Sequence, residues 1–277
     1  MSTLNCKGTL IDLSIPKVMG IINTTPDSFY DGGRKNTLSE IVSKAENMLF
    51  EGACFLDVGG YSSRPGADFV SETEELNRVL PAIKAIHNHF PKAIISIDTF
   101  RSTVAKEAVL AGASIINDIS GGTMDDHMFE TVSNLQVPYI MMHMRGTPQT
   151  MSELTSYDSI TRDLLLYFSN QLAKAKKIGI NDIIADPGFG FAKTRQQNFE
   201  VLNTLELFKN LDIPYLVGIS RKSMIYKTLE VTPDAALNGT TALNTVALMK
   251  GASILRVHDV KEAAECITLL QNLKSDS

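Results

Sequence analysis

The stretch Ala111-Gly112-Ala113-Ser114-Ile115-Ile116-Asn117 joins the end of an amphipathic segment to a short, apolar, β-branched run. A glycine in this place is typical of the end of a helix, and consecutive isoleucines indicate a strand that is buried on both faces. The same junction occurs at Glu51-Gly52-Ala53 and Lys250-Gly251-Ala252, each of which precedes another short apolar run. A recurring helix–glycine–strand junction is what repeated βα units require.

Eight runs along the chain have the composition of strands in a parallel sheet, because they are short, almost entirely apolar and rich in valine and isoleucine. They are Val18–Asn23, Cys54–Gly59, Ile94–Asp98, Ser114–Asn117, Pro138–Met142, Asp182–Asp186, Pro214–Gly218 and Ser253–Val257. Between them, apolar residues recur every three to four positions, as over 38–49 and 160–175, which predicts helices. Eight βα units in about 260 residues predict a (β/α)8 TIM barrel, with a doubly wound open sheet as the alternative.

The domain organisation follows from the absence of any linker rich in proline, glycine or serine. Residues 1–277 are therefore expected to form a single domain, with its core at about 15–273. Near the start of the chain, Asn5–Leu13 contains a turn signal at Lys7-Gly8. This segment predicts a short β-hairpin at the bottom of the barrel.

Composition excludes several classes of function. The 277 residues contain 26 Lys and Arg against 31 Asp and Glu, a formal net charge of −5, whereas broad nucleic-acid binding requires a basic face. No apolar run approaches the ~18 residues of a membrane span, and no signal peptide is recognisable. Cys6, Cys54 and Cys266 are far apart, which indicates reduced thiols in a cytoplasmic protein.

A polar or charged residue stands at or just after the end of every predicted strand. In barrel enzymes these positions meet at one mouth and carry the chemistry. An isolated Asp or Asn after a strand is often only a helix cap, but eight such positions together favour a functional pocket. They are Asn23, Ser62-Ser63-Arg64, Asp98, Asn117, His143, Asp186, Ser220-Arg221-Lys222, and Arg256 with His258.

The charges at this mouth suggest two subsites. The cations Arg64, Arg256 and His258 can hold an anion, and Asn23 can offer a neutral oxygen to a Mg²⁺ that shares it.

The second subsite lies deeper, on the middle strands, and contains Asp98, Asn117 and Asp186. A buried carboxylate needs a paired donor, and the N–H edge of a 2-amino-pyrimidinone presents two parallel donors, much as arginine does. Lys222 can donate to a ring carbonyl or nitrogen nearby. The residues alone therefore predict a phosphorylated heterocycle as substrate.

Three long connections, 24–37, 61–71 and 143–154, are polar and are expected to act as lids or substrate clamps. A fourth stretch, Gly188-Phe189-Gly190-Phe191-Ala192-Lys193-Thr194, faintly resembles a phosphate-binding loop. It lacks the Gly-Lys-[Ser/Thr] of that motif, and we reject the assignment. The Met141-Met142 pair is expected to be core packing.

Several of these segments, in order, resemble the signatures of the dihydropteroate synthase family. The first signature resembles Asn23-Thr24-Thr25-Pro26-Asp27-Ser28-Phe29 with Asp31-Gly32-Gly33, and the second resembles Asp57-Val58-Gly59-Gly60-Tyr61-Ser62-Ser63-Arg64-Pro65-Gly66. The others are Ser96-Ile97-Asp98-Thr99, Ile116-Asn117-Asp118, His143-Met144-Arg145-Gly146-Thr147-Pro148, Asp186-Pro187-Gly188, Ser220-Arg221-Lys222-Ser223 and Arg256-Val257-His258. The resemblance spans about residues 8–270, and Thr24, Ser63 and Tyr61 depart from residues common in the family.

The resemblance implies a (β/α)8 barrel, usually a homodimer, that condenses 6-hydroxymethyl-7,8-dihydropterin diphosphate with 4-aminobenzoate and uses Mg²⁺. It implies that the protein is a target of sulfonamides. Carried over by position, the pterin would bind Asp98, Asn117, Asp186 and Lys222, and the diphosphate Arg64, Arg256 and His258, with Asn23 at the Mg²⁺. Ser62 also belongs to the substrate-binding set, and Ser63, Pro65, Phe191 and Ser223 would border the aminobenzoate.

The mechanism expected from this assignment begins with departure of the diphosphate, and Asp98, Lys222, Arg256 and His258 are the expected catalytic residues. Cationic groups stabilise the charge that grows on the leaving group, and the arylamine then attacks the exocyclic methylene. Two alternatives remain open at this point. One is a non-catalytic pterin-binding paralogue, and the other is a methyltetrahydrofolate methyltransferase.

Overall fold

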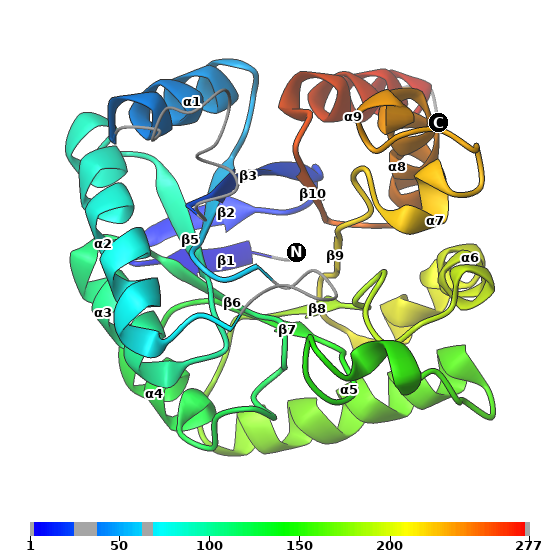
Figure 1. Cartoon of the computed structure of the whole chain (residues 1–277), viewed down its shortest axis with the longest axis horizontal. Helices are drawn as coiled ribbons and strands as arrows, with labels where there is room; N and C mark the ends of the chain where they lie inside the picture. The colour runs from blue at the N-terminus through cyan, green and yellow to red at the C-terminus, as the bar shows by residue number, and fades with distance from the viewer. Residues whose placement is uncertain (1–2, 25–37, 63–68, 275–277) are drawn as a thin grey trace.

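The computed structural model describes residues 3–24, 38–62 and 69–274. Eight parallel strands form one sheet in the order β8-β7-β6-β5-β4-β3-β10-β9, and helices surround it (Figure 1). The two ends of this sheet meet, because the amide of Ala185 in β8 donates to the carbonyl of Pro214 at 3.0 Å and Ala185 bridges Tyr215. The sheet is therefore a closed barrel, which confirms the predicted (β/α)8 fold over the open-sheet alternative.

The barrel strands coincide with the eight predicted runs. They are β3 (Lys17–Asn23), β4 (Phe55–Gly59), β5 (Ile94–Asp98), β6 (Ile115–Asp118), β7 (Tyr139–Met142), β8 (Ile183–Asp186), β9 (Leu216–Val217) and β10 (Ile254–Val257). The strand predicted at Pro214–Gly218 shortens to two residues, because Pro214 has no N–H to donate to a ladder.

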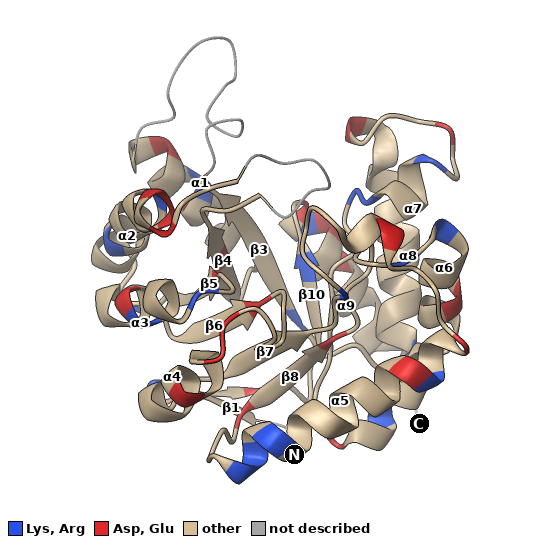
Figure 2. Cartoon of the chain, turned by 60° about the horizontal axis from the view of Figure 1, so that its bottom comes forward, with Lys and Arg blue, Asp and Glu red and all other residues tan. Residues whose placement is uncertain are grey.

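Helices connect the strands. They are α1 (Leu38–Phe50), α2 (Glu72–His89), α3 (Ser102–Ala111), α4 (Met128–Leu135), α5 (Ile160–Lys177), α6 (Arg195–Asn203), α7 (Ser223–Tyr226), α8 (Leu237–Met249) and α9 (Val260–Lys274). Short 3-10 helices cover Met151–Glu153, Leu205–Leu211 and Asp234–Ala236. Acidic and basic residues are mixed over the outer helices, whereas most of the strand ribbon carries neither (Figure 2). Within the described ranges, no helix has the length and apolarity that a membrane crossing requires.

An antiparallel hairpin, β1 (Thr3–Cys6) and β2 (Thr9–Asp12), lies at the N-terminal end of the barrel strands, as predicted. Its turn is at Lys7-Gly8, where both residues have positive φ (51° and 89°). The hairpin buries Leu4 against the lower interior of the barrel. The barrel floor is therefore closed by protein, so a ligand must enter from the opposite end.

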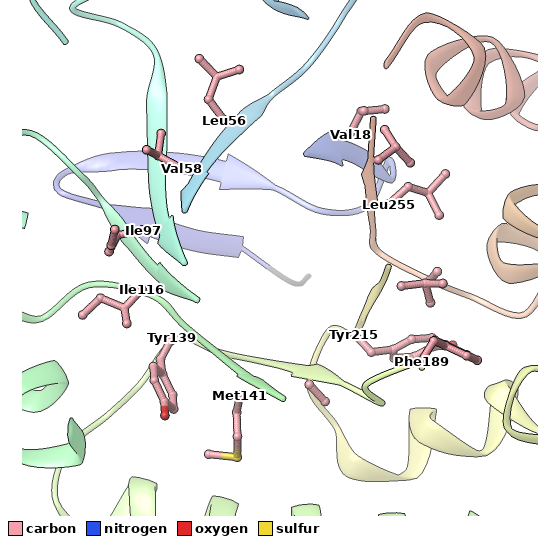
Figure 3. Close-up of a cluster of buried hydrophobic side chains, with 14 of the residues drawn as sticks. Val18, Leu56, Val58, Ile97, Ile116, Tyr139, Met141, Phe189, Tyr215 and Leu255 are labelled. Carbon is pink, nitrogen blue, oxygen red and sulfur yellow. The ribbon is translucent and has the colours of Figure 1, made fainter. Parts of the chain in front are cut away.

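Strand side chains alternate between the barrel interior and the helices. In β6, Ile116 points outward to the helix layer, where it joins a large core with Leu56, Val58, Ile97 and Leu255 (Figure 3). The residue before it, Ile115, belongs to an inner apolar layer to which each of the eight strands contributes one side chain. These side chains are Met19, Phe55, Ile94, Ile115, Ile140, Ile184, Leu216 and Ile254.

Candidate active site

The floor of the site is a polar layer immediately above the inner apolar layer. Because side chains alternate with a period of two, the residue two positions after each inner apolar residue also points into the barrel. In this way β4 supplies Asp57, β6 supplies Asn117, β8 supplies Asp186 and β10 supplies Arg256. Strand β5 ends with Asp98, which lies four positions after its inner apolar residue Ile94 and therefore also points inward. Within two residues along each of these strands, the inward-pointing side chain therefore changes from apolar to polar or charged.

Arg256 is paired with two carboxylates of this layer. Its Nε donates to Oδ2 of Asp57 at 2.6 Å, and its Nη2 donates to Oδ2 of Asp98 at 2.6 Å. Asn117 Nδ2 also donates to Asp57 Oδ2, at 3.0 Å. Asp57 is fully buried, and its Oδ1 has no hydrogen-bond partner among the described residues. A single guanidinium therefore holds two acidic side chains together at the centre of the barrel.

The pKa values of Asp98 and Asp186 are both raised. Burial raises the pKa of Asp98 to about 7, against the opposing effect of Arg256 and with a further rise from Asp57. Burial also raises the pKa of Asp186, although Lys222 and the amide of Gly188, which donates to Asp186 Oδ1 at 2.8 Å, act in the opposite direction. The pocket floor thus holds acids that take up a proton more readily than exposed ones.

Lys222 closes one wall of the pocket. It precedes α7, its Nζ donates to the carbonyl of Phe189, and that Nζ lies 4.8 Å from the centroid of the Phe191 ring. Removal from water lowers the pKa of Lys222 to about 8, in spite of the nearby Asp186 carboxylate. An ammonium with this pKa donates at neutral pH and loses its proton more easily than a surface lysine.

One pocket contains all four of the predicted pterin residues. It is lined by Asp98, Asn117, Ile119, Met142, Asp186, Phe191, Gly218, Lys222 and Arg256. Met142 is buried in an apolar cluster with Phe100 and Ile119, as predicted, and from the inward position of β7 it also lines the pocket. Its neighbour Met141 is packed in the core as predicted.

The remaining predicted residues fall into two groups. Asn23 ends β3, Ser62 is half-buried three residues beyond β4, Ser223 is the first residue of α7, and His258 directly follows β10, with its amide donating to Ser220 Oγ at 3.2 Å. Ser63, Arg64 and Pro65 lie outside the described residues, as does the 25–37 part of the first predicted lid.

His143 was predicted at the mouth, and the structure corrects this. The residue is buried, its ring packs edge-on against Tyr167 with centroids 4.8 Å apart, and its Nδ1 lies 3.2 Å from Nζ of Lys193. Since Met142 takes the inward position, His143 must point away from the barrel axis. Burial, with Lys193 and Arg145 nearby, lowers the pKa of His143 to about 2.

The neutral His143 makes the protein less stable in acid. The unfolded chain binds a proton at this histidine below about pH 6.5, whereas the folded protein does not until about pH 2. Stability from the neutral ring is therefore fully present above pH 6.5 and is lost as the pH falls, at about 1.4 kcal/mol per pH unit. Relative to His143→Asn, which retains an acceptor for Lys193, we expect the wild type to lose about 2 kcal/mol between pH 6.5 and 5.0. Urea denaturation at both pH values measures this difference, and parallel losses in the two proteins would contradict it.

Two residues of the site were missed by the sequence analysis. Asp57 lies inside a strand, whereas the candidate residues were those at or just after strand ends. The signal that could have indicated it is its position two residues after the inward-pointing Phe55. Lys193 is buried beside the pocket, in the stretch set aside as a false phosphate loop. Nothing in its spacing indicated that its side chain is buried against His143.

Comparison with known proteins places this geometry in a family. Residues 19–258 match the family described as "Pterin binding enzyme". The chain is 44% identical over 270 residues to the dihydropteroate synthase of Escherichia coli, and this match covers 97% of this chain and 95% of that protein. The dihydropteroate synthase of Yersinia pestis, solved with a sulfonamide drug complex, superposes with a TM-score of 0.93 at 40% identity and 99% coverage of both chains.

A third relative has been solved with reaction components. The dihydropteroate synthase of Xanthomonas albilineans has a structure with 7,8-dihydropteroate, which superposes with a TM-score of 0.90 at 33% identity and covers 99% of this chain and 100% of that one. Another structure of the same protein contains 4-aminobenzoic acid. The chain belongs to the family of pterin-binding enzymes and, within it, to the dihydropteroate synthases, a group of transferases.

Proposed function

We propose that this protein condenses 6-hydroxymethyl-7,8-dihydropterin diphosphate with 4-aminobenzoate to give dihydropteroate and diphosphate, a step of folate biosynthesis. The observation that carries the proposal is the single pocket in which Asp98, Asn117, Asp186 and Lys222 meet at the carboxyl end of the strands. The 7,8-dihydropteroate bound to the Xanthomonas albilineans relative supports the choice of substrates.

The pterin is proposed to lie on the charged floor. Its 2-amino-pyrimidinone edge offers two parallel N–H donors, and Asp186 is the carboxylate proposed to accept them, since it is buried beside Lys222. Lys222 would donate to the ring oxygen or nitrogen on the same side. Met142 and Phe191 line the same pocket and offer apolar contact to the faces of the ring.

The diphosphate is proposed to lie toward Arg256 and His258, at the end of β10. In the structure without ligand the guanidinium of Arg256 is paired with Asp57 and Asp98, so a bound substrate would compete with these carboxylates for it. Cationic groups aimed at the leaving oxygens favour departure, because they stabilise the charge that develops there. We therefore propose that the bond to diphosphate breaks first and that the arylamine attacks afterwards.

This order has a kinetic consequence. If departure limits the rate, the maximal rate should vary little among anilines of different basicity at saturation, since none of them takes part in the limiting step. The aminobenzoate side is proposed to include Phe191 and Ser223 of the described residues, with Ser63 and Pro65 from the second loop, whereas Arg64 of that loop is proposed for the diphosphate. Water must be excluded there, because it would trap the pterin cation.

A magnesium ion is proposed to assist through Asn23. The described residues contain no group of three acidic, histidine or cysteine side chains that could hold a metal by themselves. A site with a single neutral protein oxygen fits a Mg²⁺ that is shared with the substrate, because this ion keeps waters and substrate phosphates as most of its ligands. Asn23 ends β3 beside β4 and β10 and can supply one neutral oxygen at the mouth. When bound, the ion would neutralise charge on the leaving diphosphate.

Replacement of Asn23 by alanine tests this role. We expect the Mg²⁺ concentration needed for half-maximal activity to rise at least about tenfold, while the rate at saturating Mg²⁺ changes less. The readout is a Mg²⁺ titration of dihydropteroate formation. Asn203→Ala, an exposed amide at the end of α6, is the matched control and should keep the wild-type requirement. An unchanged requirement in Asn23→Ala would remove this residue from the metal site.

The function itself is tested by diphosphate release from dihydropterin diphosphate and Mg²⁺, with and without 4-aminobenzoate. Release coupled one-to-one to dihydropteroate is expected. Tight pterin binding without turnover would instead indicate the non-catalytic paralogue, and methyl transfer from methyltetrahydrofolate would indicate the methyltransferase.

Three further properties are proposed: a homodimer, which the family resemblance implies, a cytoplasmic location, which the widely separated cysteines indicate, and inhibition by sulfonamides, which the resemblance also implies. The sulfonamide bound to the Yersinia pestis relative supports the last of these. Sedimentation velocity measures the first, fractionation of cells the second, and competition of a sulfonamide with 4-aminobenzoate the third.

A further inference from the structure

Lys193 is a buried ammonium whose hydrogen bonds all go to neutral groups. Its Nζ donates to the carbonyls of Gly188 and Phe191, both at 3.0 Å, and lies 3.2 Å from Nδ1 of His143. Among the ion pairs of the described residues none includes this lysine, and its side chain is 8% exposed. An ammonium kept out of water without a carboxylate partner is costly, and burial accordingly lowers the pKa of the Lys193 amino group to about 7. Such an arrangement is expected to persist where the hydrogen bonds themselves are needed.

These bonds hold a loop of unusual backbone conformation between β8 and α6. Gly188, Gly190 and Ala192 all have positive φ, of 70°, 82° and 48°. For Ala192, which carries a Cβ, the left-handed conformation is unfavourable by itself, so surrounding contacts must impose it. Gly188 cannot be replaced without a shift, since a Cβ there would lie 2.2 Å from the carbonyl oxygen of His143.

The other side of the loop is fastened to α6 and to the connection before α5. The Asn198 side chain accepts from the amide of Gly190 at 2.7 Å, and the Tyr157 hydroxyl donates to the carbonyl of Ala192 at 2.9 Å. Lys193 is thus one of several side chains that hold the loop by hydrogen bonds, and it connects the loop to the end of β7 through His143.

The same loop contacts Lys222 on its pocket side. The carbonyl of Phe189 accepts from Lys222 Nζ, and the Phe191 ring lies 4.8 Å from that atom. Phe189 and Phe191 alternate with Gly188 and Gly190, so a change at the carbonyls held by Lys193 would move both contacts of Lys222. The position of the Lys222 ammonium therefore depends on the shape of the 188–193 loop.

We propose that Lys193 is a positioning residue, which fastens the 188–193 loop to the end of β7 so that Phe189 and Phe191 hold Lys222 in place for the pterin. The identity of the ligand rests on the function proposed above. This role accounts for the stretch Gly188–Thr194, which resembles a phosphate loop without being one. Lys193 acts through the loop and does not touch the substrate.

The test compares Lys193→Met with Val201→Ala, a buried truncation in α6 that leaves the loop hydrogen bonds in place. We expect Lys193→Met to raise the dissociation constant of dihydropterin diphosphate, measured by calorimetry, at least about tenfold and KM in parallel. A purely structural loss reduces the active fraction, so it lowers the apparent kcat and leaves KM unchanged, as expected for Val201→Ala. A dissociation constant within twofold of wild type in Lys193→Met would overturn the proposal.

Hydrogen exchange of the ligand-free protein provides a readout that does not depend on the substrate. Peptides covering 188–194 should exchange faster in Lys193→Met and at the wild-type rate in Val201→Ala; unchanged exchange in Lys193→Met would overturn the proposal even if affinity falls. If the wild type binds no dihydropterin diphosphate, the proposed function fails, and exchange still decides whether Lys193 holds the loop.

Should Lys193→Met not fold, Tyr157→Phe removes one loop hydrogen bond and should give a smaller change of both readouts in the same direction. No change in Tyr157→Phe would then count against the proposal.

Discussion

Asp186→Asn is expected to weaken binding of dihydropterin diphosphate by more than about 100-fold. The carboxylate is buried at the pocket floor and is the proposed acceptor for two parallel N–H groups of the pterin. An asparagine amide offers only one acceptor oxygen, and its NH2 group would face one of the N–H donors of the pterin. The loss of a charge-assisted hydrogen bond and the new unsatisfied donor together correspond to about 3 kcal/mol.

Isothermal calorimetry measures this affinity, and the chain offers a matched control. Asp182 lies just before β8, at the opposite end of the same strand, where its Oδ2 accepts from the amide of Asn5 at 3.0 Å. Asp182→Asn makes the same chemical change at the N-terminal end of the barrel, which the hairpin closes, and should leave the pterin affinity within twofold. If Asp186→Asn also binds within twofold of wild type, the assignment of the pterin edge to Asp186 is wrong.

Arg256→Met is expected to produce the second large effect, on both stability and catalysis. Without the guanidinium, the buried Asp57 and the nearby Asp98 lose their cationic partner, and breaking a buried pair costs about 3–5 kcal/mol. The proposed role at the leaving group predicts a fall in kcat of about 100-fold or more. The catalytic effect should remain when rates are normalised to the folded fraction.

The stability part has a defined pH dependence. Burial already raises the pKa of Asp98 to about 7, and removal of the opposing cation raises it further. The folded variant then binds more protons than the unfolded chain, so the stability from the protonated Asp98 is fully present below the unfolded pKa of about 4 and is lost as the pH rises through the raised folded pKa, above 7.

Urea denaturation of Arg256→Met at pH 5 and pH 8 measures this dependence. Arg162→Met is the control, because Arg162 is exposed and its ion pairs should contribute at most about 1 kcal/mol. A cost for Arg256→Met that is equal at the two pH values would contradict the account of the carboxylate pair.

Much of the fold could be predicted from the sequence because its signals are local. The helix–glycine–strand junctions and the apolar runs indicated all eight strands, and only the strand around Leu216 is clearly shorter than predicted. The turn at Lys7-Gly8 indicated the hairpin. Closure of the barrel is not local, since it depends on the pairing of Ala185 in β8 with Pro214 and Tyr215, which precede β9.

The site was predictable where inward positions lie at or next to strand ends, as they do for Asp98, Asn117 and Asp186. Where they differ, the prediction was wrong. Met142 is the inward residue of β7, which turns His143 away into the packing around Tyr167. Asp57 was missed for the converse reason, because it points inward from the middle of a strand.

The central claim is that the charged layer above the inner apolar floor is the pterin site. A crystal structure of the protein with 7,8-dihydropteroate tests it most directly. The account predicts the pterin within hydrogen-bond distance of Asp186 and Lys222, with the aminobenzoate portion extending past Phe191 toward the mouth. A pterin bound outside the barrel, or one in the barrel that leaves Asp186 and Lys222 without contact, would contradict it.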